Sequence, residues 1–222
     1  MPLAVIVPAA GTGSRFGGGL PKQFQTLAGK PVIQHVIERF LLDEQVTRVI
    51  VPVAEVLLAN VKNSERVSFV AGGETRQQSV IRGLAEAEDA ELIAVHDAAR
   101  PLFSIEIFHA VVEAARVFGA ALPVVPVTDT IHLMNSDSTV AQTLDRTMLA
   151  AAQTPQCFRA ELLREILERA EREGIEGTDE AGLAARFGHR VRAVPGDPRN
   201  LKITVPEDLA RAESYLQQWS AT

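Results

Sequence analysis

The sequence predicts an α/β fold in which a doubly wound, mostly parallel sheet of the Rossmann-like type carries helices on both faces. Five short segments indicate the strands, because each is rich in β-branched residues and apolar along nearly its whole length, as strands buried on both faces are. They span 3–8, 46–53, 66–72, 91–97 and 120–127. Segments with helical periodicity separate most of them, which is typical of parallel strands whose ligands bind at the carboxyl ends.

Three helices are expected between these strands. The first begins at Pro31, a residue that suits the first helical turn. The second begins at Thr75, which suits a capping position. The third begins at Ser104, whose side chain suits an N-cap, and stops at Gly119, which suits a C-terminal end.

The alternation of predicted strands and helices stops after Val127. Residues 128–146 contain two short alternating runs around the turn-rich stretch NSDS, which predicts a protruding β-hairpin arm. The remaining predicted elements are helices at 159–174, 179–188 and 206–219 and a strand at 190–196. Since no internal repeat or linker divides the chain, we expect a single domain over residues 1–222, with the arm at 127–147.

Composition argues against several partners. The net charge of −6 at pH 7 gives no global basic field, and aromatic residues make up only 5% of the chain, so nucleic acid is not expected as a partner. No membrane partner is expected either, because no apolar run reaches spanning length. Cys157 is the only cysteine, and the sequence enters a strand without a basic, apolar leader. We therefore expect a cytoplasmic protein.

A glycine-rich segment, PAAGTGSRFGGGLPKQF at 8–24, follows the first predicted strand. Such a turn presents backbone N–H groups and lets a phosphate approach closely. The dinucleotide-binding fingerprint needs a glycine where Phe16 stands and an acidic residue where Pro52 and Val53 end the second strand. A P-loop needs Ser or Thr where Pro31 follows Gly-Lys. Both patterns fail.

Two cations in this segment favour a polyphosphate ligand. Arg15 suits bidentate contact with phosphate oxygens and Lys22 offers a compact point charge. An acidic protein needs such a local cluster to hold an anion. A surface loop without a ligand is the alternative, because a glycine motif alone is a weak signal.

The blocks AAGTGSRF and PKQF resemble the signature of the sugar-phosphate nucleotidyltransferases, and specifically that of the 2-C-methyl-D-erythritol 4-phosphate cytidylyltransferase family. The resemblance extends over nearly the whole chain. Its further blocks are GGETRQQSVIRGL at 72–84, VHDAARP at 95–101, VTDT at 127–130, LDRTMLAAAQTPQCF at 144–158, GTDEAG at 177–182 and NLKITVPEDL at 200–209. Several ordered blocks are far more specific than one glycine loop.

The resemblance implies an enzyme of the non-mevalonate route to isoprenoid precursors, which transfers CMP from CTP to the 4-phosphate of methylerythritol phosphate and releases pyrophosphate. It implies that Arg15 and Lys22 stabilise the charge of the transition state. Mg²⁺ is the expected cofactor, held mainly by the CTP phosphates, because a hard, oxygen-ligated ion usually keeps several waters and needs few protein ligands. The five histidines show no metal-ligand spacing and are expected to be structural. Two alternatives stay open: a ribitol 5-phosphate cytidylyltransferase, and a nucleotide-binding module without catalysis.

Small residues and glycine turns at strand ends are the expected nucleotide contacts. The alanines and glycine after the first strand let a nucleotide lie against the strand end, and the turn after the third strand offers backbone groups to cytosine. The predicted nucleotide-binding residues are Pro8, Ala9, Ala10, Gly11, Gly13, Gly72, Gly73, Glu74, Ser79, Asp97 and Ala98. A tight turn before a helix capped by Thr75 is the alternative for Gly72 and Gly73, and the two interpretations are compatible.

The acceptor contacts come from the resemblance. They are Asp97, Arg100, Thr130, Arg146, Thr178, Asp179 and Lys202. Lys202 also stands on its own argument, since an inward lysine needs an anionic partner, and with Arg146 it joins Arg15 and Lys22 in the expected catalytic set. Alternatives remain for three residues: Asp97 as a helix cap, Arg100 as a structural ion-pair partner, and Thr178 as an N-cap.

The hairpin arm predicts a partner subunit. Two isolated strands are not stable in water and need another surface to pack on. The resemblance implies a homodimer formed by exchange of arms, in which Arg146 reaches the acceptor phosphate of the partner. The alternative for Arg146 is a surface ion pair of little energetic value.

Overall fold

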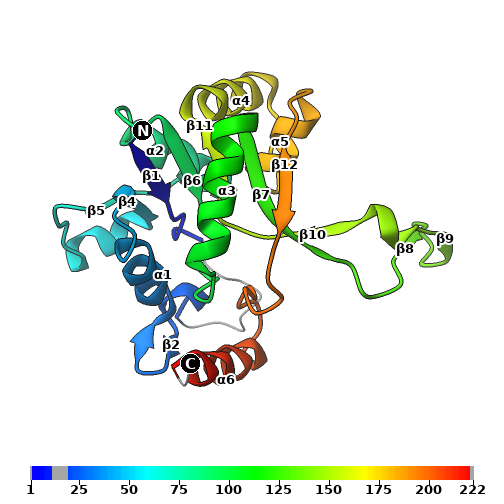
Figure 1. Ribbon diagram of the computed structural model, residues 1–222, viewed down its shortest axis with the longest axis horizontal. Helices are drawn as coiled ribbons and strands as arrows, with labels where there is room; N and C mark the ends of the chain where they lie inside the picture. Colours follow the sequence, from blue (N-terminus) through cyan, green and yellow to red (C-terminus); the bar gives the residue numbers. More distant parts are fainter. Residues whose placement is uncertain (1, 12–19, 221–222) are drawn as a thin grey trace.

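The computed structural model describes residues 2–11 and 20–220, and a mixed sheet forms its centre (Figure 1). Among these residues the sheet has eight strands in the order β10-β7-β11-β6-β1-β4-β5, with β12 paired to β7. The strands are β1 (Leu3–Ile6), β4 (Val46–Val53), β5 (Val67–Ala71), β6 (Leu92–Val95), β7 (Ala120–Pro126), β10 (Ala150–Ala152), β11 (Gln156–Arg159) and β12 (Arg192–Pro195). The α/β class predicted from the sequence is confirmed.

The order of the strands reverses at β1, which pairs in parallel with β4 on one side and with β6 on the other. In open α/β sheets, this reversal opens a crevice at the carboxyl ends of the strands. The glycine-rich segment after β1 therefore begins at this crevice.

Strands β10 and β11 were not predicted from the sequence. Both run antiparallel to β7, and β11 also runs antiparallel to β6. Strand β11 carries Gln156 and Arg159 at its ends and only two apolar residues between them, so it lacks the continuous apolar run of a buried strand. The sheet is consequently mixed, with a parallel part that surrounds β1.

Helices cover both faces of the sheet because β1 alternates between two cores. Leu3 and Val5 face the core formed with α1 (Val32–Leu41) and α3 (Ile105–Phe118). Ala4 and Ile6 face the other core. The helices on that second face are α2 (Arg76–Ala85), α4 (Ala160–Glu173) and α5 (Glu180–Arg186). The doubly wound arrangement thus follows from a strand that is apolar on both sides.

The predicted caps lie where the sequence places them. The Thr75 side chain accepts a hydrogen bond from the backbone of Gln78 at the start of α2. Ser104 accepts one from Ile107 at the start of α3. That helix ends at Gly119, whose φ of 90° is in a region that L side chains rarely adopt. Local side-chain chemistry therefore determines these helix boundaries.

The remaining elements are short or lie at the edges. Helix α6 (Glu207–Ser220) packs on a third apolar cluster, which includes Leu27, Leu102 and Ile203. The short elements are η2 (Lys22–Phe24), β2 (Thr26–Leu27), β3 (Lys30–Pro31), η3 (Glu55–Asn60) and η4 (Arg146–Met148). Within the described residues, none of the helices combines the length and the apolarity needed to cross a membrane.

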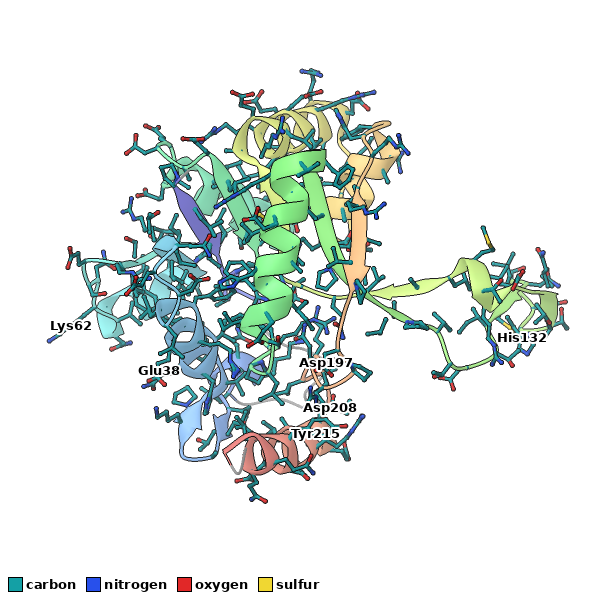
Figure 2. The ribbon with its side chains drawn as sticks, viewed as in Figure 1. Glu38, Lys62, His132, Asp197, Asp208 and Tyr215 are labelled. Carbon is teal, nitrogen blue, oxygen red and sulfur yellow. The ribbon has the colours of Figure 1, made fainter. Side chains whose placement is uncertain are left out.

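A hairpin of β8 (His132–Met134) and β9 (Val140–Thr143) stands away from the sheet and its helices (Figure 1). Figure 2 shows the side chains around His132 far from those of the rest of the chain. Every residue of both strands is exposed, and the apolar residues Leu133 and Val140 are each 54% exposed. Exposed apolar strands of this kind need a further surface to be stable.

Candidate active site

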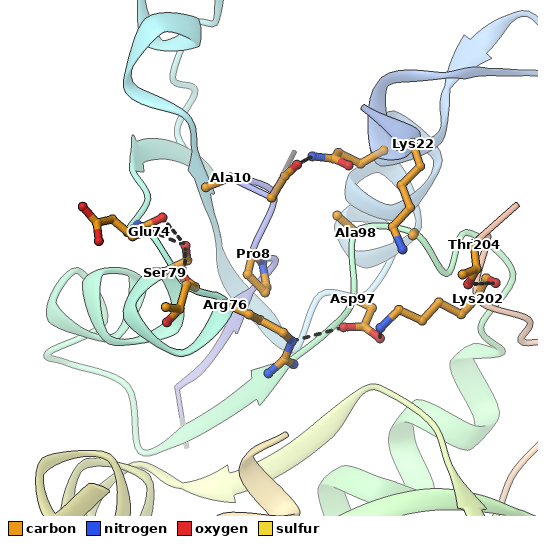
Figure 3. A pocket seen from close by; sticks show the side chains of 15 residues that line it. Pro8, Ala10, Lys22, Glu74, Arg76, Ser79, Asp97, Ala98, Lys202 and Thr204 are labelled. Carbon is orange, nitrogen blue, oxygen red and sulfur yellow. Dashed lines mark hydrogen bonds and ion pairs between the residues drawn. The ribbon is translucent and has the colours of Figure 1, made fainter. Parts of the chain in front are cut away.

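A cleft opens at the carboxyl ends of β1, β5 and β6, as expected at the reversal of strand order (Figure 3). Backbone segments after these three strands form its walls, and η2 and the chain before α6 close it. The residues that line it are Pro8, Ala10, Gly11, Lys22, Gln23, Gly73, Glu74, Thr75, Arg76, Ser79, Asp97, Ala98, Ala99, Lys202 and Thr204. Most of the predicted nucleotide-binding residues are among them.

The turn after β5 packs closely against the segment after β1. A Cβ atom on Gly72 would lie 2.3 Å from the Cβ of Ala10, so only glycine fits there. The Gly73 N–H donates to Ser79 Oγ over 3.1 Å, which fixes the direction of the turn. The pair therefore forms a tight turn before a capped helix, and Gly73 lines the cleft, while its contact with cytosine stays a prediction.

Gln23 ties η2 to the segment after β1. Its Nε2 donates to the carbonyls of Ala9 and Gly11 over 2.7 and 2.8 Å. The side chain is 4% exposed, and its backbone neighbour Lys22 points into the cleft (Figure 3). Gln23 was not predicted from the sequence as a site residue, although it lies in the PKQF block. Ala9 itself is buried and does not line the cleft.

Two predicted residues of the glycine-rich segment, Gly13 and Arg15, lie outside the described residues. Their expected roles with the nucleotide remain predictions. The described part of the segment ends at Gly11, which lines the cleft, and resumes at Leu20, two residues before Lys22, which also lines it.

Asp97 lies at the centre of a charge cluster. Among the described residues, Lys202 Nζ lies 2.9 Å from its Oδ2, Arg76 Nε lies 3.3 Å from its Oδ1, and Arg100 Nε lies 3.4 Å from its Oδ2. Figure 3 shows Arg76 and Lys202 approaching the carboxylate from opposite sides. Its side-chain contacts are therefore ion pairs, and the alternative of a helix cap finds no support among them.

The cluster keeps Asp97 ionised. Burial alone would raise the pKa of this carboxyl, but the charges of Arg76, Lys202 and Arg100 and the hydrogen bond from Lys202 outweigh it. The pKa of Asp97 consequently lies well below its ordinary value of 3.8. At neutral pH the carboxylate is a fixed acceptor in a cationic environment.

His96 helps to fix the backbone of Asp97 through the Thr154 hydroxyl. Burial lowers the pKa of His96 to about 3, so its ring is neutral. One ring nitrogen, Nε2, lies 2.9 Å from the Arg100 carbonyl oxygen, which requires it to donate. The other, Nδ1, then accepts from Thr154 Oγ1 over 3.1 Å, and that hydroxyl accepts from the Asp97 N–H over 3.0 Å. This histidine is structural, as expected from the sequence.

A second hollow adjoins the cleft and shares Arg76, Asp97 and Lys202 with it. Its other lining residues are Arg100, Ala152, Gln153, Thr154, Gln156, Thr178 and Asp179. It therefore contains five of the seven predicted acceptor-binding residues. The three shared residues form the boundary between the two spaces.

Asp179, and not Thr178, is the N-cap of α5. Its Oδ1 accepts from the Gly182 N–H over 2.8 Å, and its Oδ2 accepts from Gln156 Nε2 over 2.7 Å. The alternative that made Thr178 the cap is therefore wrong by one residue. Thr178 stays exposed and lines the second hollow.

Two predicted acceptor residues belong to the arm and line neither hollow in the described structure. Thr130 is exposed, and Arg146 donates from Nη1 to the Thr128 carbonyl over 2.7 Å. Arg100 is held differently, since its Nη1 donates to the Asn200 carbonyl over 2.7 Å while its Nε faces Asp97. A single chain thus gathers only part of the predicted acceptor set.

Protein ligands for a metal are not concentrated anywhere in the described residues, where no group of three or more His, Cys, Asp or Glu side chains meets. Cys157 is fully buried in β11, and burial raises its pKa to about 12. Its thiol is an apolar part of the core.

The fold and the cleft are those of a nucleotidyltransferase: glycine turns and cations meet at the carboxyl ends of the central strands, beside a second hollow. A model of the family described as 2-C-methyl-D-erythritol 4-phosphate cytidylyltransferase (IspD) matches residues 3–218. The chain belongs to this family, and the resemblance found in the sequence is confirmed.

Relatives of the same description agree along the whole chain. The protein from Geobacillus kaustophilus is 43% identical over 218 residues, which cover 95% of each chain. That from Solibacter usitatus is 39% identical over 240 residues, which cover 100% of this chain and 98% of the relative. The crystal structure of the Thermus thermophilus enzyme is similar with a TM-score of 0.83 and 35% identity, covering 98% of this chain and 100% of that one.

Proposed function

We propose that this chain transfers CMP from CTP to the phosphate of 2-C-methyl-D-erythritol 4-phosphate. The products are 4-diphosphocytidyl-2-C-methyl-D-erythritol and pyrophosphate, as in the non-mevalonate route to isoprenoid precursors. The observation that carries the proposal is the arrangement around Asp97, where two adjoining spaces, one for the nucleotide and one for the acceptor, share the cationic side chains of Arg76 and Lys202. Membership of the family names the two substrates.

The cleft suits CTP from its base to its phosphates. The turn at Gly73 and the neighbouring Ser79 line the cleft, and they are the expected contacts of cytosine. Asp97 is an ionised acceptor for ribose hydroxyls. Lys22 points into the same space. Together with Arg15, it is expected to neutralise the charge of the triphosphate.

The second hollow suits the acceptor phosphate. Lys202 and Arg100 supply positive charge there, and Thr178 and Asp179 supply polar groups for a polyol. Lys202 is bound to Asp97 through one contact and remains 41% exposed, so its ammonium has donors left for a phosphate oxygen.

The reaction needs positioning and charge more than covalent help. An oxygen of the acceptor phosphate attacks the α-phosphorus of CTP and forms a new P–O–P link. The bond between the α-phosphorus and the bridging oxygen breaks, and pyrophosphate leaves with the electron pair. Negative charge accumulates on the α-phosphate and on the leaving group, so preorganised cations such as Lys22 lower the barrier.

A divalent metal, expected as Mg²⁺, fits this site only if the nucleotide carries most of its ligands. Asp97 is the carboxylate at the centre of the cleft, and both of its oxygens already contact cations. Mg²⁺ commonly binds through phosphate oxygens and water with few protein ligands. When bound, it would add charge neutralisation at the phosphates.

We further propose that the chain forms a homodimer through its arm. Exchanged arms would cover the exposed apolar strands β8 and β9. They would also bring Arg146 and Thr130 of one protomer to the acceptor hollow of its partner, which supplies the two acceptor residues that a single chain leaves outside. The exposed position of Arg146 on the arm supports this role.

A substrate panel tests the proposal. Each of the four nucleoside triphosphates is combined with methylerythritol phosphate or ribitol 5-phosphate in the presence of Mg²⁺, and pyrophosphate release is measured. We expect CTP with methylerythritol phosphate to give the highest kcat/KM. Preference for UTP or for ribitol 5-phosphate would contradict the assigned substrates, and no release with any pair would indicate a binding module.

A further inference from the structure

Arg76 links two carboxylates that lie far apart in the sequence. Its Nη1 donates to Glu180 Oε1 over 2.7 Å, and its Nε lies 3.3 Å from Asp97 Oδ1. The first contact joins the start of α2 to the start of α5. The second reaches the loop after β6, as Figure 3 shows. One guanidinium therefore spans the two, using different nitrogens for each partner.

Glu180 is itself held rigidly. Its side chain is 1% exposed. It is the first residue of α5, whose start is fixed by the Asp179 cap and by Gln156, which accepts from the Ala181 N–H over 3.0 Å. A carboxylate on such an anchored turn can fix the rotation of the Arg76 side chain.

Burying the charged side chain of Glu180 costs free energy, and stability alone does not explain it. Within the described part of the chain, Oε2 of this side chain is buried and has no hydrogen-bond partner. A buried ion pair with an unsatisfied oxygen gives little net stability, and apolar residues of similar size would serve packing as well. The pair is better explained by what it does to Asp97.

We propose that Glu180 and Arg76 are positioning residues for the transfer reaction: Glu180 orients the Arg76 guanidinium, and Arg76 holds the Asp97 carboxylate between the nucleotide cleft and the acceptor hollow. This inference rests on the proposed function. Arg76, Asp97 and Lys202 are the residues that both spaces share, so a displacement of Asp97 affects both substrates at once.

Electrostatics is consistent with this order of action. Burial would lower the pKa of Arg76, but the charges and hydrogen bonds of Glu180 and Asp97 outweigh it and raise this pKa above its ordinary value. The guanidinium is therefore permanently charged. Lys202 and Arg100 both contact the other oxygen, Oδ2, so the loss of Arg76 leaves the Asp97 carboxylate held through that oxygen alone.

The test is a cycle of variants measured as kcat/KM with CTP and methylerythritol phosphate. We expect Glu180→Gln and Arg76→Gln each to lower kcat/KM on the order of tenfold or more, because small misplacements at a reacting centre are costly. If Glu180 acts through Arg76, the double variant is no worse than Arg76→Gln alone, within about twofold. Effects that multiply would overturn the proposal.

Arg76→Lys separates geometry from charge. It retains the positive charge, but its single nitrogen replaces the two separate nitrogens with which Arg76 contacts Glu180 and Asp97. We expect a loss close to that of Arg76→Gln. This variant also keeps the test decisive if Glu180→Gln does not fold, because parent-like kcat/KM in folded Arg76→Lys refutes the positioning role.

Gln77→Leu is the matched control. Gln77 joins the same two parts of the chain, since its amide bonds to the Ile175 carbonyl and the Gly177 N–H over 3.1 and 2.9 Å, but it has no contact with Asp97 in the described structure. We expect a lower urea midpoint with kcat/KM within about twofold of the parent. An equal loss of kcat/KM in this variant would show that joining the segments, and not Asp97, is what matters.

The parent is assayed first. An inactive parent would count against the proposed function, whereas an active parent with fully active, folded variants would count against this inference alone.

Discussion

Replacing Gly72 by alanine is the most direct test of the nucleotide turn. The new Cβ would lie 2.3 Å from the Cβ of Ala10, whereas carbon atoms in contact prefer at least about 3.5 Å. The segments after β1 and β5 must therefore separate by about 1.2 Å. Such overpacking costs about 1–3 kcal/mol of stability. A displacement of about 1 Å at a binding turn can lower the rate on the order of hundredfold.

Steady-state kinetics and urea unfolding of Gly72→Ala measure the two effects separately. Gly83→Ala is the control, because its Cβ would lie 2.7 Å from Ile6 Cγ2 and overpacks the core behind α2 without touching the cleft. We expect both variants to lose stability and only Gly72→Ala to lose kcat/KM for CTP. Parent-like kcat/KM in folded Gly72→Ala would refute the reasoning that this turn positions the nucleotide.

Three further predictions concern charge. Lys22→Ala and Arg15→Ala should each lower kcat on the order of hundredfold while urea midpoints stay near the parent value, because transition-state charge is lost; near-parent kcat would remove that residue from the mechanism. Arg146→Ala should raise KM for the acceptor much more than KM for CTP. Mixing this variant with Lys22→Ala should restore activity after subunit exchange, because one site of the mixed dimer is then intact. A monomeric active enzyme would contradict this prediction. The neutral, buried His96 stabilises the fold above its unfolded pKa of about 6.5, and this contribution is lost as the pH falls toward about 3. Between pH 6.5 and 5 the parent should therefore lose about 1.6 kcal/mol that a His96→Asn variant does not lose, measured by urea unfolding; equal pH dependence would show that His96 is not the group responsible.

The apolar strands and the local caps could be predicted from the sequence because they depend on neighbouring residues. Strand β1 is apolar on both sides, and this alone indicates helices on both faces of the sheet. Thr75, Ser104 and Gly119 mark helix ends through contacts within a few residues. The family blocks likewise indicate the enzyme family, because each block is a short run of consecutive residues and the blocks follow one another in a fixed order.

The charge cluster could not be predicted in this way. Arg76 and Glu180 are 104 positions apart, and nothing near either residue indicates the other. The same holds for Gln156, which is a polar residue in a weakly patterned strand until β11 pairs with β6 and brings it to the start of α5. Thr178 and Asp179 are adjacent candidates for one cap, and only the backbone path decided that Asp179 takes it.

The sequence by itself therefore determined the α/β class, the helix ends and the family, because periodicity, capping and ordered motifs are written within short stretches of chain. Only the tertiary structure decided that Asp97 is held among Arg76, Arg100 and Lys202, and that these groups stand between two adjoining spaces. The physical reason is that an ion pair depends on distance in space and on burial, and both arise only when the strand order brings remote segments to one edge of the sheet.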